Sequence, residues 1–265
     1  FSTSAVVRTL LKAAPGPPVA DAFLDLGVIQ TPVRIAPAAH ARKRQGGGIG
    51  KLERTSVLSM SLLRRGRLVA ASGVPSALFG CSVTAPSVAA LRSLQTAAFH
   101  AVWRSGSRSA QELVFGLFVP WRGKPGAVSI VQPIQFLRDA IRRGVLEVES
   151  LPWLVSVAPT TGPVHAFLTA CHRAGLRVSP DATTLITNGT RLAWISDPWF
   201  LVRHAILGAL LRKSYAAVAS RRPTFAALTN GVDRGLTLEF ESSPWPESRK
   251  AALRVVLTGG VIVQN

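Results

Sequence analysis

Residues 87–103 read SVAALRSLQTAAFHAVW, and the spacing of their apolar side chains decides the fold class. Apolar residues recur there at intervals of three and four positions: Val88, Leu91, Leu94, Ala98 and Val102. That spacing lines one face of a helix with side chains suited to a core. Thr84 or Ser87 can cap its start, and Pro86 suits a first turn. We therefore predict an amphipathic helix here.

Working outward, the same spacing predicts further helices at about residues 52–71, 108–118, 127–142, 163–174, 198–220 and 245–258. Gly144 and Gly175 follow two of these helices and are typical helix stops. Residues 176–195 predict a small β-hairpin instead, because Asn188-Gly189 separates two β-prone runs. The range 22–35 can form a strand pair. The fold class we expect is mainly α, a helical bundle followed by a smaller α+β region with one β-hairpin.

The length of 265 residues suggests one large domain or two small ones. Along the chain we expect three consecutive parts, residues 1–45, 46–158 and 159–265. The segment 40–51, HARKRQGGGIGK, is basic and rich in glycine. Since glycine-rich chains are flexible, we expect a mobile linker there. The chain begins with Phe1 rather than Met, which leads us to expect a fragment of something longer.

Charge points to a polyanionic partner. The chain has 31 Lys and Arg against 13 Asp and Glu, a formal net charge of +18. Such a field attracts nucleic acid first, RNA or DNA, and an anionic membrane surface second. A merely basic protein with an Arg-rich composition is the plain alternative.

The cations crowd near the amino-terminal end of the chain, where only Glu53 opposes them. We predict that most of the nucleic-acid affinity comes from eight side chains there: Arg42, Lys43, Arg44, Lys51, Arg54, Arg64, Arg65 and Arg67. The last three also suit the end of a helix, whose dipole favours cations without any ligand. Trp121 and Trp153, each beside a proline, are the better candidates for exposed rings that could stack on bases.

No complete catalytic or metal site is visible in the sequence. The run GGGIGK fails as a phosphate loop because Leu52 stands where Ser or Thr is required, and Lys51 stands where a dinucleotide motif needs glycine. His165, Cys171 and His172 share a predicted helix, but a zinc site needs three or four converging ligands. Aspartates are scattered, with Asp21 and Asp25 the only close pair, so a two-metal polymerase or nuclease centre is not expected. We expect no cofactor and see no small-molecule substrate.

The compartment follows from weaker signals. Residues 68–91 lack charge, but glycines and prolines interrupt them, so we expect buried helical pieces rather than a membrane span. Cys81 and Cys171 are too few and too far apart for a disulfide framework. Together with the lack of a secretory leader, they suggest an intracellular protein with reduced thiols.

Four segments occur in a familiar order: Asp25–Val28 (DLGV), residues 72–81 (SGVPSALFGC), Leu91–Arg104 and residues 112–117 (ELVFGL). They resemble the "LGV" segment, the "LPALLYGCE" segment and the "LRRLRTALLRALWG" helix with its continuation in non-LTR, LINE-type retrotransposon reverse transcriptases. These segments follow the catalytic palm in that family.

The later part, residues 162–260, resembles a region of dinoflagellate-like elements between the thumb and a Cys/His knuckle, through Gly231-Val232-Asp233 and residues 253–259 (LRVVLTG). The resemblance implies that residues 1–45 hold the end of a palm and a linker, that residues 46–158 form a helical thumb and connector, and that the chain grips template–primer duplex in the nucleus. The family's metal-binding aspartates have no counterpart here, and Phe79 and Ser82 replace the aromatic and acidic residues of "YGCE".

Two other interpretations stay open. The chain could be an unrelated basic structural protein, such as an RNA-bound component of an organellar ribosome. It could also be an enzyme domain whose active site the sequence does not reveal, although the scarcity of carboxylates argues against metal-dependent chemistry.

Overall fold

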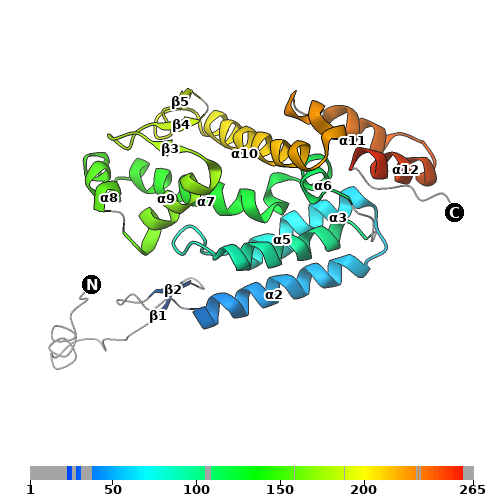
Figure 1. Ribbon diagram of the computed structural model, residues 1–265. Coiled ribbons are helices and arrows are strands. Elements are labelled where there is room, and N and C mark those ends of the chain that lie inside the picture. The colour runs from blue at the N-terminus through cyan, green and yellow to red at the C-terminus, as the bar shows by residue number, and fades with distance from the viewer. Residues whose placement is uncertain are drawn as a thin grey trace.

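The computed structural model describes residues 23–25, 28–30, 38–104, 109–157, 159–187, 189–230, 232 and 234–258. Within these ranges the chain is mainly helical with two small antiparallel sheets (Figure 1), which confirms the predicted fold class. Residues 1–22 lie outside the description. So do Leu26, Gly27, Gly231, Asp233 and Gly259, which belong to segments that carry the family resemblance.

The first half of the chain comprises β1 (Phe23–Asp25), β2 (Val28–Gln30), α2 (Ala38–Val57), α3 (Leu62–Leu68), a π-helical turn (Val69–Gly73), α4 (Val74–Ala77), α5 (Val88–Val102) and α6 (Gln111–Phe118). The two strands pair antiparallel, with Leu24 opposite Ile29. This agrees with the strand pair expected within residues 22–35.

The second half comprises a 3-10 turn (Trp121–Gly123), α7 (Pro125–Arg142), a 3-10 turn (Val148–Ser150), α8 (Leu151–Val157), α9 (Gly162–Ala174), β3 (Arg177–Val178), β4 (Leu185–Thr187), β5 (Thr190–Leu192), α10 (Trp199–Arg221), a 3-10 segment (Pro223–Asn230), α11 (Arg234–Ser242) and α12 (Glu247–Leu257). In Figure 1, α10 runs beside α7 toward α6, and both contacts are close.

The predicted mobile linker is wrong, because residues 40–51 are part of α2. Packing overrides the low helix propensity of the glycines there. Leu52 is fully buried, and a β-carbon added at Gly73 would lie 2.3 Å from its Cδ2 atom. Gln45 also donates a 3.0 Å hydrogen bond from Nε2 to the carbonyl of Ala90 in α5. Tertiary contacts of this kind routinely decide whether a marginal helix forms.

The prediction of a single helix over residues 52–71 is also wrong, because α2 ends at Val57 and α3 begins at Leu62. Ser61 caps the new helix by accepting a 3.4 Å hydrogen bond from the backbone amide of Arg64. A serine in this position satisfies an amide that has no partner within the helix. The cap therefore marks the start of a second helix within the range for which the sequence predicted one.

Most other helices lie within a few residues of their predictions. Ser87 caps α5 by accepting a 3.1 Å hydrogen bond from the amide of Ala90, and Pro86 precedes the cap instead of starting the helix. Gly175 ends α9 in the left-handed conformation, with φ of 71°. Gly144 also has a positive φ, of 69°, just beyond α7. The sequence did not predict α8, α11 or the 3-10 segment at residues 223–230.

Two large hydrophobic clusters form the core. One is built from α2 to α6 and includes the fully buried Leu52, Val102 and Val119. The other is built from α7 to α10 and the three-stranded sheet, around Phe167 and Trp194. Trp121 packs against both, and α7 contributes Val128 to the first and Ile130 to the second. The clusters are therefore continuous through α7.

The predicted hairpin is present as β4 and β5, with Thr187 opposite Thr190, and β3 extends it to three strands. Asn188, at the turn, lies outside the described residues. Arg138 of α7 is buried beneath the segment that leaves β5. It donates hydrogen bonds to the carbonyls of Trp194, at 2.9 Å, and Asp197, at 2.5 Å.

Candidate nucleic-acid interface

The predicted cations lie on α2 and α3. Six of the eight side chains are exposed: Arg42, Lys43, Lys51, Arg54, Arg64 and Arg67. Glu53 is the only acidic residue between Asp25 and Glu112, so this part of the chain carries almost unopposed positive charge. We call the six exposed cations of these two helices the basic surface.

The helical form of α2 orders part of this surface. Lys43, Gly47, Gly50 and Arg54 are spaced by three or four residues and therefore share one side of the helix. The rise of 1.5 Å per residue separates Lys43 from Arg54 by about 16 Å along the axis. Gly47 is exposed and a β-carbon there would meet no atom within 4 Å. The two cations thus flank a stretch of bare backbone that a ligand could approach closely.

Lys51 lies nearer to α4 and donates a 2.9 Å hydrogen bond from Nζ to the hydroxyl of Ser76. Within the described part of the chain, Lys43, Lys51, Arg54, Arg64 and Arg67 form no ion pair with a carboxylate. Their charge is therefore available to an anion from outside. Exposed, unpaired guanidinium and ammonium groups are what phosphate contacts require.

Arg104 stabilises the connection between the two helices that carry the basic surface. Its Nε donates a 2.6 Å hydrogen bond to the carbonyl of Ser56, and its Nη2 donates to the carbonyl of Leu58. These bonds hold the segment between α2 and α3 against the end of α5. Sequence reasoning missed this residue because its partners are 46 and 48 positions away.

Arg65 differs from the other predicted cations because it is buried. This side chain is only 8% exposed, and its Nε and Nη1 find no hydrogen-bond partner among the described residues. Burial lowers the pKa of its guanidinium, and the nearby charges of Arg104 and Arg254 lower it further. Arg65 lies on the side of α3 that faces the core, which its neighbours Arg64 and Arg67 do not share.

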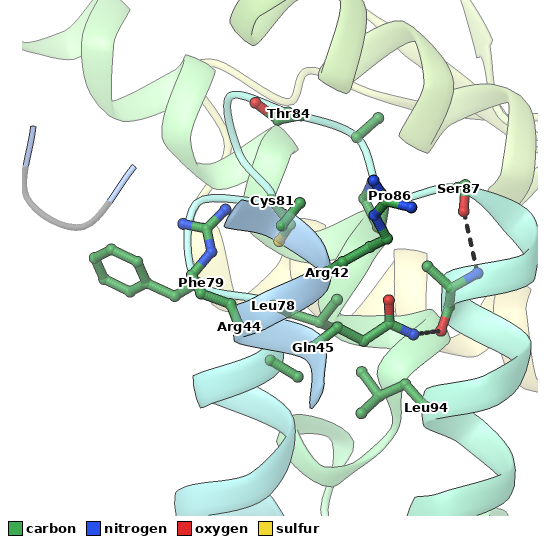
Figure 2. Close-up of a pocket in the computed structure, with 14 residues that line it drawn as sticks. Arg42, Arg44, Gln45, Leu78, Phe79, Cys81, Thr84, Pro86, Ser87 and Leu94 are labelled. Carbon is green, nitrogen blue, oxygen red and sulfur yellow. Dashed lines mark hydrogen bonds between the residues drawn. The ribbon is translucent and has the colours of Figure 1, made fainter. Parts of the chain in front are cut away.

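Arg44 is half-buried and, with Arg42, lines a pocket of about 410 Å³ (Figure 2). The pocket lies between the start of α2, the segment 78–87 and the start of α5. In Figure 2 both guanidinium groups point from α2 toward the segment 78–87. The half-exposed ring of Phe79 lies at the pocket's edge and points away from them.

This pocket combines two kinds of group that contact nucleotides in proteins, namely guanidinium groups and an aromatic ring. Guanidinium groups pair with phosphate oxygens, and an exposed aromatic ring offers a face on which a base can stack. The amino-terminal end of α5, capped by Ser87, adds a favourable dipole for an anion. Cys81 lies in the pocket wall, where its Sγ is 3.0 Å from Oε1 of Gln132, and burial raises the pKa of its thiol to about 12. The thiol is therefore protonated at neutral pH and unsuited to nucleophilic chemistry.

The two tryptophans that were candidates for base stacking differ in their exposure. Trp153 is 65% exposed, as predicted. Trp121 is half-buried, and the guanidinium groups of Arg122 and Arg203 lie 5.5 and 5.9 Å from its ring centroid. Trp153 belongs to α8, and Trp121 lies in the 3-10 turn before α7, where it packs against both hydrophobic clusters, so neither ring is part of α2 or α3.

Among the described residues, no three His, Cys, Asp or Glu side chains gather into a group that could hold a metal ion. His165 contacts the carbonyl of Pro159 at 3.0 Å through Nδ1 and the hydroxyl of Thr169 at 3.4 Å through Nε2. Cys171, on the same helix, is buried.

In the described part of the chain, no helix is both long enough and apolar enough to cross a membrane. Comparison with protein-family models, with curated proteins and with solved structures finds no match to this chain.

Proposed function

We propose that this chain binds nucleic acid, RNA or DNA, through the basic surface of α2 and α3. The observation that carries the proposal is a run of exposed cations with one acidic residue, Glu53, in more than eighty positions of sequence. Contacts of this kind neutralise phosphates and release counterions, so binding is salt-sensitive and only weakly dependent on base sequence.

The resemblance to LINE-type reverse transcriptases supports a more specific version of the proposal. In that version the helices form part of a thumb and connector that grips template–primer duplex in the nucleus, while the catalytic aspartates belong to another part of the protein. The chain itself supplies positioning and affinity, with no catalytic residue. A basic component of an organellar ribosome is the alternative, and it would prefer folded RNA over a primer–template duplex.

A salt titration of binding tests the proposal. Fluorescence anisotropy would follow a labelled RNA–DNA duplex with a recessed primer end, with single-stranded and folded RNA for comparison. One variant replaces the exposed cations of the basic surface with glutamine: Arg42, Lys43, Lys51, Arg54, Arg64 and Arg67. A matched control removes the same charge from exposed positions on other elements: Arg142, Arg143, Arg177, Arg191, Arg212 and Arg249.

We expect the slope of log Kd against log salt to fall by about 0.9 for each phosphate that the variant no longer neutralises, so by roughly 5 if all six cations contribute. The control variant has the same net charge and should keep the slope of the unchanged protein. Equal reductions in the two variants would mean that net charge, rather than this surface, drives binding. Failure of the unchanged protein to bind any of the three nucleic acids at about 50 mM salt would overturn the proposal altogether.

A further inference from the structure

A second site lies in a groove of about 730 Å³ on another part of the molecule. Residues from α5, α6, the start of α7 and the middle of α10 line it, and α10 packs against both α6 and α7. In Figure 1, α10 lies beside α7, and α6 lies near the end of α10. A groove of this volume is in the range of small-molecule sites.

The lining combines an apolar body with cationic groups. Phe115, Leu207 and Leu211 are among its apolar residues, while Lys124, which precedes α7, and Arg234, which begins α11, are among its cationic ones. The other charged or titratable residues that line the groove are Glu112 of α6, Arg173 of α9, His204 and Lys213 of α10, and Arg234 of α11, and the charge of Arg234 acts on Lys124. Glu112, the one carboxylate among them, is paired with Arg221 at 2.5 Å.

Lys124 is the decisive residue. Lys124 lines the groove, and within the described residues its half-buried side chain makes no hydrogen bond and no ion pair. An ammonium that has lost part of its water shell and has no partner is stabilised when an anion pairs with it. Burial, and then the charge of Arg234, lower the pKa of Lys124 to about 7. The other lysine of the groove, Lys213, already donates a 3.1 Å hydrogen bond to the carbonyl of Arg173.

We propose that this groove binds a small organic anion, whose carboxylate, phosphate or sulfonate group pairs with Lys124 beside Arg234 while its aromatic or aliphatic body packs against α10. Charge complementarity supports this occupant, because the groove holds an unpaired cation and its one carboxylate is already paired. The site is distinct from the basic surface, and the inference does not depend on the nucleic-acid proposal.

Two glycines allow the groove to be filled without removing charge. A β-carbon at Gly126 would meet no atom within 4 Å, and one at Gly208 would meet only Nη1 of Arg212, at 3.5 Å. Both residues lie in helices and line the groove. Gly208→Leu should therefore occupy the groove while leaving the backbone undisturbed.

The test uses a matched pair of fluorescent probes. 1-Anilinonaphthalene-8-sulfonate carries a permanently ionised group, and N-phenyl-1-naphthylamine has the same aromatic body without it. Titration of the full chain should give a sulfonate Kd that rises at least tenfold in Lys124→Met and in Gly208→Leu. Lys124→Arg, which keeps the charge, should restore binding to within about threefold. The neutral probe should respond to Gly208→Leu and not to Lys124→Met. Gly47→Leu, on exposed α2, controls for the gain in helix propensity.

A pH series supplies a second readout. Because the sulfonate stays ionised, its affinity for the unchanged protein should weaken as the pH rises through about 7, where Lys124 loses its charge. The Lys124→Arg variant should bind equally at pH 6 and pH 9. Repeating the series in His204→Gln removes the histidine that lines the groove from the comparison. A circular-dichroism melt confirms that each variant is folded.

Each remaining outcome overturns the proposal. If neither Lys124→Met nor Gly208→Leu changes the sulfonate Kd, the probe binds elsewhere. If only Gly208→Leu weakens it, the groove takes apolar ligands without anion recognition. If only Lys124→Met weakens it, the lysine acts outside the groove. The six-site variant of the basic surface should keep full probe binding, which separates this result from failure of the proposed nucleic-acid function.

Discussion

Gly48 of α2 lies directly against Ala77 of α4, so closely that a β-carbon added at Gly48 would be 2.4 Å from the Cβ of Ala77 and 2.9 Å from its Cα. No side chain longer than hydrogen fits there without moving backbone. The neighbouring Gly47 faces solvent and would meet nothing. Adjacent glycines of one helix therefore serve opposite purposes, one for packing and one for an open surface.

Gly48→Ala should destabilise the protein by about 1–3 kcal/mol, because overpacking forces the backbones of α2 and α4 apart. Gly47→Ala should instead stabilise it by about 0.5–1 kcal/mol, since alanine is the better helix former at an exposed site. Urea unfolding followed by circular dichroism measures both. Equal effects of the two substitutions would show that residues 46–50 are not packed as a helix.

Arg65→Met should leave nucleic-acid affinity within about twofold of the unchanged protein while raising stability by about 1–2 kcal/mol, because a buried cation with unsatisfied nitrogens is replaced by an apolar side chain of similar length. Arg64→Met is the matched control on the same helix. It should weaken binding and change stability by less than about 0.5 kcal/mol. Loss of affinity in Arg65→Met would show that Arg65 contributes to nucleic-acid binding after all.

Arg138→Met should lower the free energy of unfolding by about 1–3 kcal/mol, since the carbonyls of Trp194 and Asp197 lose their buried donor. Arg142, one turn later on the same helix, is exposed, so Arg142→Met should stay within about 0.5 kcal/mol of the unchanged protein. Thermal and urea unfolding of the two variants give the comparison. An unaffected Arg138→Met would mean that water or other donors replace the guanidinium without cost.

Cys81 and Cys171 should resist thiol reagents until the protein unfolds. Burial raises the pKa of Cys81 to about 12 and shifts that of Cys171 upward still further, so almost no reactive thiolate exists at pH 8. The two thiols lie in different hydrophobic clusters. Reaction of Cys81→Ala and Cys171→Ala with a disulfide reagent across a urea series therefore reports on each cluster separately. One shared midpoint is expected, because α7 joins the clusters; two midpoints would contradict that continuity.

The sequence predicted those helices and turns that are determined by residues close together along the chain. The apolar stripe of α5 and the glycine stops after α7 and α9 depend on spacing and on backbone conformation, and both can be read along the chain. Helix α2 could not be predicted in this way. Its glycines indicate a flexible segment, and only contacts with Ala77, Gly73 and Ala90, at remote positions, make the helix stable.

The same distinction applies to the candidate sites. The density of cations on α2 and α3 is a property of composition, and it was visible at once. The inward side chain of Arg65 was not, because the break at Ser61 resets the phase of α3 relative to α2. The groove around Lys124 was also hidden, since its walls come from segments as distant as Leu91 and Arg234. Sequence patterns do not reveal which helices enclose a lysine.

The bonds from Arg138 have a consequence for motion. A segment that opens and closes over a ligand needs a hinge at its base, and the base of this hairpin is the turn between β5 and α10. Arg138 ties that turn to α7 at two carbonyls, Trp194 and Asp197. The hairpin can therefore move outward only if the buried guanidinium of Arg138 loses both of its hydrogen bonds. We expect the hairpin and the helices to move as one rigid body.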